Sequence, residues 1–179
     1  KIGPAEDPST TMPPVVDRDS QARVLRYAEI AKREGKLLGE QAVPAGLDGC
    51  YVPVVIAKDC DPKGQLCQEE VFGPVVAVMP VATLDEALDI ADNTIYALTG
   101  GLYSRSPQNI ARVRHEMRVG NLYINRKITG AVVDRQPFGG ARMSGVGSKA
   151  GGPDYLLQFL VPRTITESVM RRGFAPSED

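Results

Sequence analysis

Residues 125–155 of this chain read NRKITGAVVDRQPFGGARMSGVGSKAGGPDY and contain a large share of its 18 glycines. Glycine can adopt positive φ angles and lets the backbone approach a ligand closely. Flexible linkers are also rich in glycine, but they rarely carry Ile, Val, Phe and Met in the same window. We therefore interpret this stretch as an ordered loop system that faces a ligand, rather than as a tether.

The sequence before this stretch alternates between strand and helix patterns. Strands are expected over residues 36–40, 51–57, 74–81, 98–103 and 119–125, and helices over residues 17–34, 84–91 and 107–117. Such alternation is typical of βαβ units. The predicted fold class is therefore α/β, with a mainly parallel sheet and flanking helices. Beyond the glycine-rich loops we expect a short helix over residues 154–160 and a strand over residues 163–169.

Composition limits the classes of function. The net charge of −1 gives no reason to expect a nucleic-acid or membrane surface. Three cysteines, an odd number in a chain of this size, indicate reduced thiols and a cytoplasmic location rather than a disulfide framework. With a single histidine in the chain, we do not expect a zinc site. The first residue is Lys1 and not Met, so we expect a piece of a longer protein.

Two runs in the glycine-rich stretch resemble known signatures. PFGG at residues 137–140, followed by Ser144 and Gly145, resembles the late PFGGxxxSG signature of the aldehyde dehydrogenase superfamily. SKAGGPDY at residues 148–155, with TGA at residues 129–131, is similar to the branch that oxidises glutamate γ-semialdehyde, the Δ1-pyrroline-5-carboxylate dehydrogenases. The resemblance implies an NAD-dependent oxidoreductase of proline catabolism that forms L-glutamate.

The run EEVFGP at residues 69–74 is a candidate cofactor site. From the residues alone, a solvated loop is about as good an interpretation as a ligand site. A carboxylate can accept hydrogen bonds from both hydroxyls of a ribose, and an aromatic ring offers a face to a flat ring. The run is similar to the superfamily's EE(V/I)FGP motif. This resemblance implies that Glu70 holds the nicotinamide ribose of NAD and that Phe72 lies near the nicotinamide.

The semialdehyde of glutamate carries an α-carboxylate, which requires hydrogen-bond donors. Backbone N–H groups of a glycine turn can supply them. The resemblance implies that Gly130 and Ala131 anchor the amino-acid end of this small-molecule substrate, and that Phe138 packs on its aliphatic part. Core packing beneath a loop is the alternative for Phe138. Lys149 follows no P-loop pattern, so we interpret it as a structural or interface residue.

Gly64-Gln65-Leu66-Cys67 superficially matches the superfamily's GQxC nucleophile motif. The chemistry requires one thiolate that attacks the aldehyde carbonyl. Cys67, however, lies only three residues before Glu70, whereas the nucleophile of the resembled enzymes belongs to an earlier part of the catalytic domain. We therefore predict that none of the three cysteines is catalytic, and that this chain by itself is inactive.

The resemblance also implies how the chain is organised. Residues 1–160 would be a partial catalytic domain, and residues 161–179 a C-terminal oligomerisation strand and tail that makes a homo-oligomer. Two alternatives stay open: another branch, such as a succinate semialdehyde dehydrogenase, which the TGA and SKAGGPDY runs disfavour, and a non-catalytic assembly module. Whether the parent also has a proline-oxidising flavin domain is left open by these residues.

Overall fold

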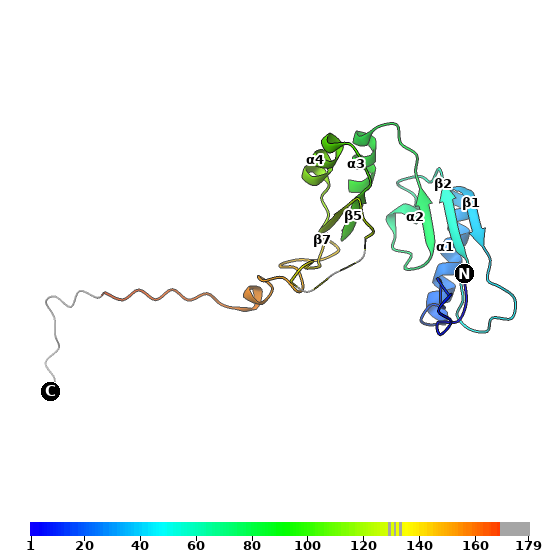
Figure 1. Cartoon of the computed structure of the whole chain (residues 1–179), viewed down its shortest axis with the longest axis horizontal. Helices are drawn as coiled ribbons and strands as arrows, with labels where there is room; N and C mark the ends of the chain where they lie inside the picture. The colour runs from blue at the N-terminus through cyan, green and yellow to red at the C-terminus, as the bar shows by residue number, and fades with distance from the viewer. Residues whose placement is uncertain (129, 131, 133, 169–179) are drawn as a thin grey trace.

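The computed structural model describes residues 1–128, 130, 132 and 134–168, and these residues form two lobes (Figure 1). The first lobe holds α1 (Arg18–Glu34), β1 (Lys36–Gln41), β2 (Val54–Lys58), α2 (Gln65–Gln68) and β3 (Val75–Val78). The second holds α3 (Leu84–Asp92), β4 (Tyr96–Ala97), β5 (Thr99–Leu102), α4 (Pro107–Glu116), β6 (Asn121–Ile124) and β7 (Ala141–Arg142), followed by a short 3-10 turn. A single stretch of backbone after β3 leads from the first lobe into α3 of the second (Figure 1).

The first lobe is a three-stranded sheet with one helix packed on it. β1 (Lys36–Gln41) pairs antiparallel with β2 (Val54–Lys58), which pairs parallel with β3 (Val75–Val78). Helix α1 (Arg18–Glu34) begins where the Asp17 carboxylate accepts a hydrogen bond from the Ser20 N–H, and ends at Gly35. Its apolar side packs on the central strand to form the core, whose buried members are Tyr27, Ala28, Ile30, Ala31, Val55, Ala57, Cys60 and Leu66.

The second lobe places two short helices beside two small sheets. Helix α3 (Leu84–Asp92) and helix α4 (Pro107–Glu116) are joined by an ion pair of 2.6 Å between Arg112 and Asp85. β5 (Thr99–Leu102) pairs parallel with β6 (Asn121–Ile124), as expected for two strands separated by a helix. β4 (Tyr96–Ala97) pairs antiparallel with β7 (Ala141–Arg142), which lies inside the glycine-rich stretch.

The three longer helices lie where the sequence predicts them, but the sheets are mixed rather than mainly parallel. Among the described residues, two strand pairs are parallel and two are antiparallel, in three small sheets. The pair β1–β2 is connected by residues 42–53 without a helix, and an antiparallel pair needs no helical crossover. Helix α2 (Gln65–Gln68) and strand β7 are not among the predicted elements, because each is too short to show a periodic pattern.

The predicted C-terminal elements are only partly present. The expected helix over 154–160 is a 3-10 turn, η1 (Leu156–Phe159). Residues 163–168 form no strand, and Val169 lies outside the described residues. Leu156, Phe159 and Val161 are 71%, 69% and 92% exposed, and the chain extends away from both lobes (Figure 1). A strand needs a neighbouring strand for its backbone hydrogen bonds, and the described part of this segment pairs with no strand of either lobe.

No helix among the described residues is long and apolar enough to cross a membrane.

Candidate functional site

The EEVFGP run forms a loop between α2 and β3. The N–H of Glu69 donates to the carbonyl of Gln65 and ends helix α2. A Cβ atom on Gly73 would lie 2.4 Å from Cγ2 of Val24 in helix α1, so only glycine allows the loop to approach the helix this closely. The loop is thus an ordered connection that packs on the first lobe.

Glu70 is exposed and lines a hollow of about 440 Å³ at the junction of the two lobes. The other residues of this hollow come mainly from the second lobe: Ala91, Thr94, Tyr96, Ala97, Leu98, Thr99, Met117, Val119 and Ser144. Within the described residues, the Glu70 carboxylate forms no hydrogen bond or ion pair, in contrast to Glu69. Both of its oxygens are therefore available to accept hydrogen bonds from a ligand's hydroxyl groups.

Phe72 is 73% exposed, and its backbone is in the left-handed region, with φ of 54°. It lines a different hollow, of about 450 Å³, together with Val15, Val16 and Arg23. An exposed aromatic face can stack on a flat ring. The structure thus places Glu70 and Phe72 on one loop but at two separate hollows.

The PFGG turn is held from both sides by side chains. Asn121, the first residue of β6, donates from Nδ2 to the carbonyl of Pro137 over 2.8 Å and accepts from the N–H of Gly139 over 3.1 Å. The ammonium of Lys149 donates to the carbonyl of Gly139 over 2.6 Å. Phe138 is half-buried and exchanges two backbone hydrogen bonds with Ala150. Lys149 therefore has the structural role that the sequence analysis gave it.

Gly130 is held by the same strand. Its φ of 79° is a left-handed conformation that favours glycine, and its carbonyl accepts from the hydroxyl of Tyr123 over 3.0 Å. Tyr123 is two residues after Asn121 in β6, so both side chains leave the same face of the strand. Strand β6 thereby holds both Gly130 and the turn that contains Phe138. Ala131 lies outside the described residues.

Asn121 and Tyr123 hold the loops that carry the candidate residues Gly130 and Phe138, and the sequence analysis missed them. Their alternation along a strand was the only signal, and it is the ordinary pattern of a half-buried strand. Only the hydrogen bonds of Asn121 to Pro137, 16 residues further on, and of Tyr123 to Gly130, 7 residues further on, show that these two side chains hold the loops.

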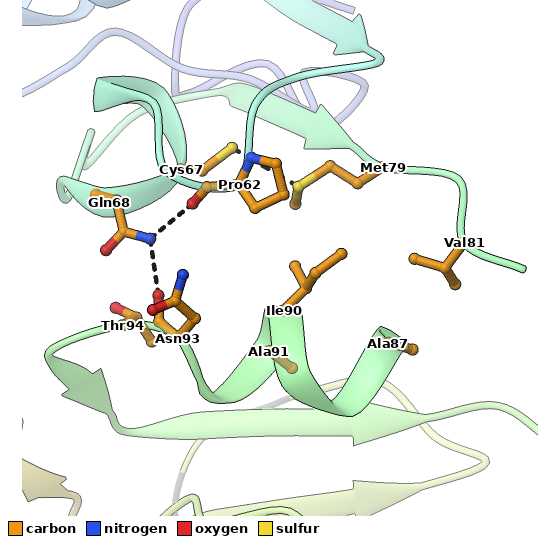
Figure 2. A pocket seen from close by; sticks show the side chains of 10 residues that line it. All are labelled: Pro62, Cys67, Gln68, Met79, Val81, Ala87, Ile90, Ala91, Asn93 and Thr94. Atoms are coloured by element: carbon orange, nitrogen blue, oxygen red, sulfur yellow. Dashed lines mark hydrogen bonds between the residues drawn. The ribbon is translucent and has the colours of Figure 1, made fainter. Parts of the chain in front are cut away.

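Cys67 lies in a third hollow, of about 390 Å³, between α2 and α3 (Figure 2). Its Sγ atom is 3.9 Å from Sδ of Met79, and burial raises the pKa of its thiol. A nucleophilic cysteine needs the opposite shift, because the thiolate is the attacking form. Cys60 is buried in the core and the pKa of its thiol is also raised by burial.

The described residues contain no group of three or more His, Cys, Asp or Glu placed to hold a metal ion.

The aldehyde dehydrogenase family model matches residues 1–165, so this chain belongs to the aldehyde dehydrogenase family. It is 46% identical over 169 residues to a 1-pyrroline-5-carboxylate dehydrogenase of Geobacillus, an alignment that covers 93% of this chain and 32% of the relative. The corresponding enzyme of Bacillus subtilis is 47% identical over the same shares of the two chains. This chain therefore spans about a third of the length of these curated relatives.

Solved structures agree with the sequence matches. Proline utilization A from Bdellovibrio bacteriovorus, inactivated by N-propargylglycine, superposes with a TM-score of 0.89 at 54% identity, over 99% of this chain and 18% of that one. The 1-pyrroline-5-carboxylate dehydrogenase from Thermus with bound NAD gives a TM-score of 0.82 at 43% identity, over 88% of this chain and 30% of that one. The resemblance to this branch of the family is confirmed.

Proposed function

We propose that this chain is the part of an NAD-dependent L-glutamate γ-semialdehyde dehydrogenase that contacts the nicotinamide ribose and anchors the substrate. The observation that carries the proposal is the identity of 46% to a 1-pyrroline-5-carboxylate dehydrogenase over 93% of this chain. In the overall reaction the aldehyde carbon loses a hydride and gains an oxygen from water, which gives the γ-carboxylate of glutamate. NAD⁺, when bound, supplies the hydride acceptor.

The residues of the EEVFGP loop fit the cofactor. The exposed carboxylate of Glu70 can accept from two ribose hydroxyls, and the exposed ring of Phe72 can lie beside the nicotinamide. A relative with bound NAD superposes on 88% of this chain, which supports this choice of cofactor.

The two loops held by side chains of β6 suit the amino-acid end of the substrate. We assign the anchor to the backbone of Gly130 and Ala131, and the contact with the aliphatic part to Phe138. The left-handed turn at Gly130, fixed by the Tyr123 hydroxyl, supports a backbone site for a carboxylate. No charged side chain is needed for this contact, which suits a substrate that also carries an ammonium group.

The division into residues 1–160 and 161–179, the cytoplasmic location and the homo-oligomer stay predictions. The exposed apolar side chains of Leu157, Val161 and Ile165 support a role for the C-terminal segment in association between subunits. The raised pKa of the Cys67 thiol supports a nucleophile from outside this chain.

The test is an NADH-formation assay on the protein expressed from its complete reading frame. Δ1-pyrroline-5-carboxylate should be turned over and succinate semialdehyde should not. Glu70→Gln should raise the KM for NAD, whereas Glu6→Gln, an exposed control, and Cys67→Ser should have little effect. Preference for succinate semialdehyde would place the protein in another branch of the family, and loss of turnover in Cys67→Ser would overturn the assignment of the nucleophile.

A further inference from the structure

Helix α1 holds the EEVFGP loop through three side chains. Nε of Arg23 donates to the carbonyl of Val71 over 3.2 Å, and the hydroxyl of Tyr27 donates to Oε2 of Glu69. Val24, between them in sequence, is fully buried against Gly73. Arg23 and Tyr27 are four residues apart and therefore lie on the same side of the helix. The helix thus contacts every second residue of the loop.

The two residues between these contacts are the ones assigned to the cofactor. Glu69, Val71 and Gly73 contact side chains of α1, although Glu69 and Gly73 are also exposed to solvent. Glu70 and Phe72 are exposed and form no hydrogen bond to α1 among the described residues. The two neighbouring glutamates therefore differ in role. Glu69 accepts from Tyr27 and also from Nε2 of Gln65 over 2.9 Å, whereas Glu70 has no such partner among the described residues.

The backbone of this loop also needs support. Phe72 has a φ of 54°, which is unfavourable for a bulky residue by roughly 1–2 kcal/mol. Such a conformation persists where the surrounding structure determines it. Here the residue before Phe72 is held by Arg23 and the residue after it by Val24. Tyr27 is itself 3% exposed and has Arg26 stacked over its ring at 5.2 Å, so this anchor is fixed in place.

We propose that Arg23 and Tyr27 are positioning residues for the cofactor: by holding Val71 and Glu69 they fix the directions of Phe72 and Glu70. This inference rests on the proposed function of Glu70 and Phe72. Tyr27 acts through Glu69, and Arg23, which also lines the hollow beside Phe72, acts here through its hydrogen bond to Val71. They order the loop before the cofactor binds, so the loop loses less conformational entropy on binding. Their removal should therefore weaken NAD binding more than it slows the chemical step.

The experiment compares Tyr27→Phe and Arg23→Met with matched controls in the protein expressed from its complete reading frame. Tyr51→Phe removes the hydroxyl of another buried tyrosine, and Arg18→Met removes an arginine of α1 whose side chain, among the described residues, hydrogen-bonds to Gln21 of its own helix. Arg23→Lys keeps a donor near the Val71 carbonyl and serves as the rescue variant. The readouts are the dissociation constant of NAD, the separate values of kcat and KM for NAD, and hydrogen exchange of residues 69–75 without NAD.

Tyr27→Phe and Arg23→Met should each weaken NAD binding by about threefold to tenfold, the usual effect of one hydrogen bond. Their KM for NAD should rise in parallel, kcat should change by less than about twofold, and residues 69–75 should exchange faster. Both control variants should behave like the wild type, and Arg23→Lys should recover most of the binding.

Two results would overturn the inference in distinguishable ways. Faster exchange in residues 69–75 with unchanged NAD binding would show that α1 only stabilises the loop. A wild-type protein that does not bind NAD would overturn the proposed function itself, and this inference with it.

Discussion

Glu69 and Glu70 are neighbouring carboxylates with different surroundings. The hydrogen bond from Tyr27, and then that from Gln65, lowers the pKa of Glu69, and no such donor faces Glu70 among the described residues. A carboxylate whose pKa is lower in the folded than in the unfolded state stabilises the fold above its unfolded pKa of about 4.3. That stabilisation is lost as the pH falls through the folded pKa.

We therefore expect Tyr27→Phe to make the stability of the protein less dependent on pH in the acid range. Without the hydroxyl, the pKa of Glu69 in the folded state moves toward its unfolded value, so acid removes less stabilisation. Urea unfolding of both proteins between about pH 3 and pH 6 measures the effect. Parallel curves for the wild type and the variant would show that the Tyr27 hydroxyl does not affect the titration of Glu69.

Gly120 is the residue at which the PFGG loop approaches the backbone most closely. A Cβ atom there would lie 1.9 Å from the carbonyl oxygen of Gly139 and 2.6 Å from Cα of Gly140, both backbone atoms that cannot rotate away. Gly120→Ala should destabilise the protein by roughly 2–3 kcal/mol, as overpacking does. At Gly39 a Cβ atom meets nothing within 4 Å, so Gly39→Ala is the matched control in denaturant unfolding. Equal stability of the two variants would contradict this reading of the contact.

At the scale of elements, α3 depends on its N-terminal cap. Oγ1 of Thr83 accepts from the N–H of Glu86 over 3.2 Å, and the Glu86 carboxylate accepts from the N–H of Ala82 over 2.8 Å. Side chains therefore satisfy one free N–H group of the first turn, that of Glu86, and the N–H group of Ala82 just before the N-cap. The apolar side of this helix forms one wall of the hollow around Cys67 (Figure 2).

Thr83→Ala removes the cap and should lower the free energy of unfolding by about 1 kcal/mol, with faster hydrogen exchange in the first turn of α3. Thr83→Ser keeps a hydroxyl acceptor and should stay close to the wild type. A loss of stability in Thr83→Ser as large as in Thr83→Ala would mean that the methyl group, and not the hydrogen bond, is what matters at this position.

At the scale of the whole molecule, Gln68 links the two lobes just before the EEVFGP loop. Its Nε2 donates to the carbonyl of Pro62 in the first lobe and to that of Asn93 in the second, each over 2.7 Å (Figure 2). Asn93 is the C-terminal cap of α3, so one amide connects the two walls of the hollow.

Gln68→Ala should therefore increase hydrogen exchange around Asn93 and cost about 1–2 kcal/mol, because two carbonyls lose their shared donor. Gln41→Ala, at an exposed position at the end of β1, is the matched control. Exchange around Asn93 that is the same in both variants would show that the lobes do not depend on this amide.

Local sequence patterns were sufficient to predict the three longer helices and to identify the EEVFGP motif. Asp17 and Gly35 mark the ends of α1, Thr83 caps α3, and EEVFGP is contiguous, so all of this information lies within a few residues of sequence. The pairing of the strands could not be predicted from such local patterns. The antiparallel β4–β7 pair joins Ala97 to Ala141, and two-residue strands carry no periodic pattern.

The candidate site, too, could be predicted from the sequence only in part. The sequence by itself determined which residues resemble a cofactor motif and a substrate loop, because those residues are consecutive. Only the tertiary structure decided that Glu69 accepts a hydrogen bond from Tyr27, 42 residues away, and that the carbonyl of Val71 accepts one from Arg23, 48 residues away. Among the described residues, Glu70 has no such partner. Contacts of this kind depend on how α1 packs on the sheet, and a helix that packs through its buried side chains determines what its neighbouring loop can touch.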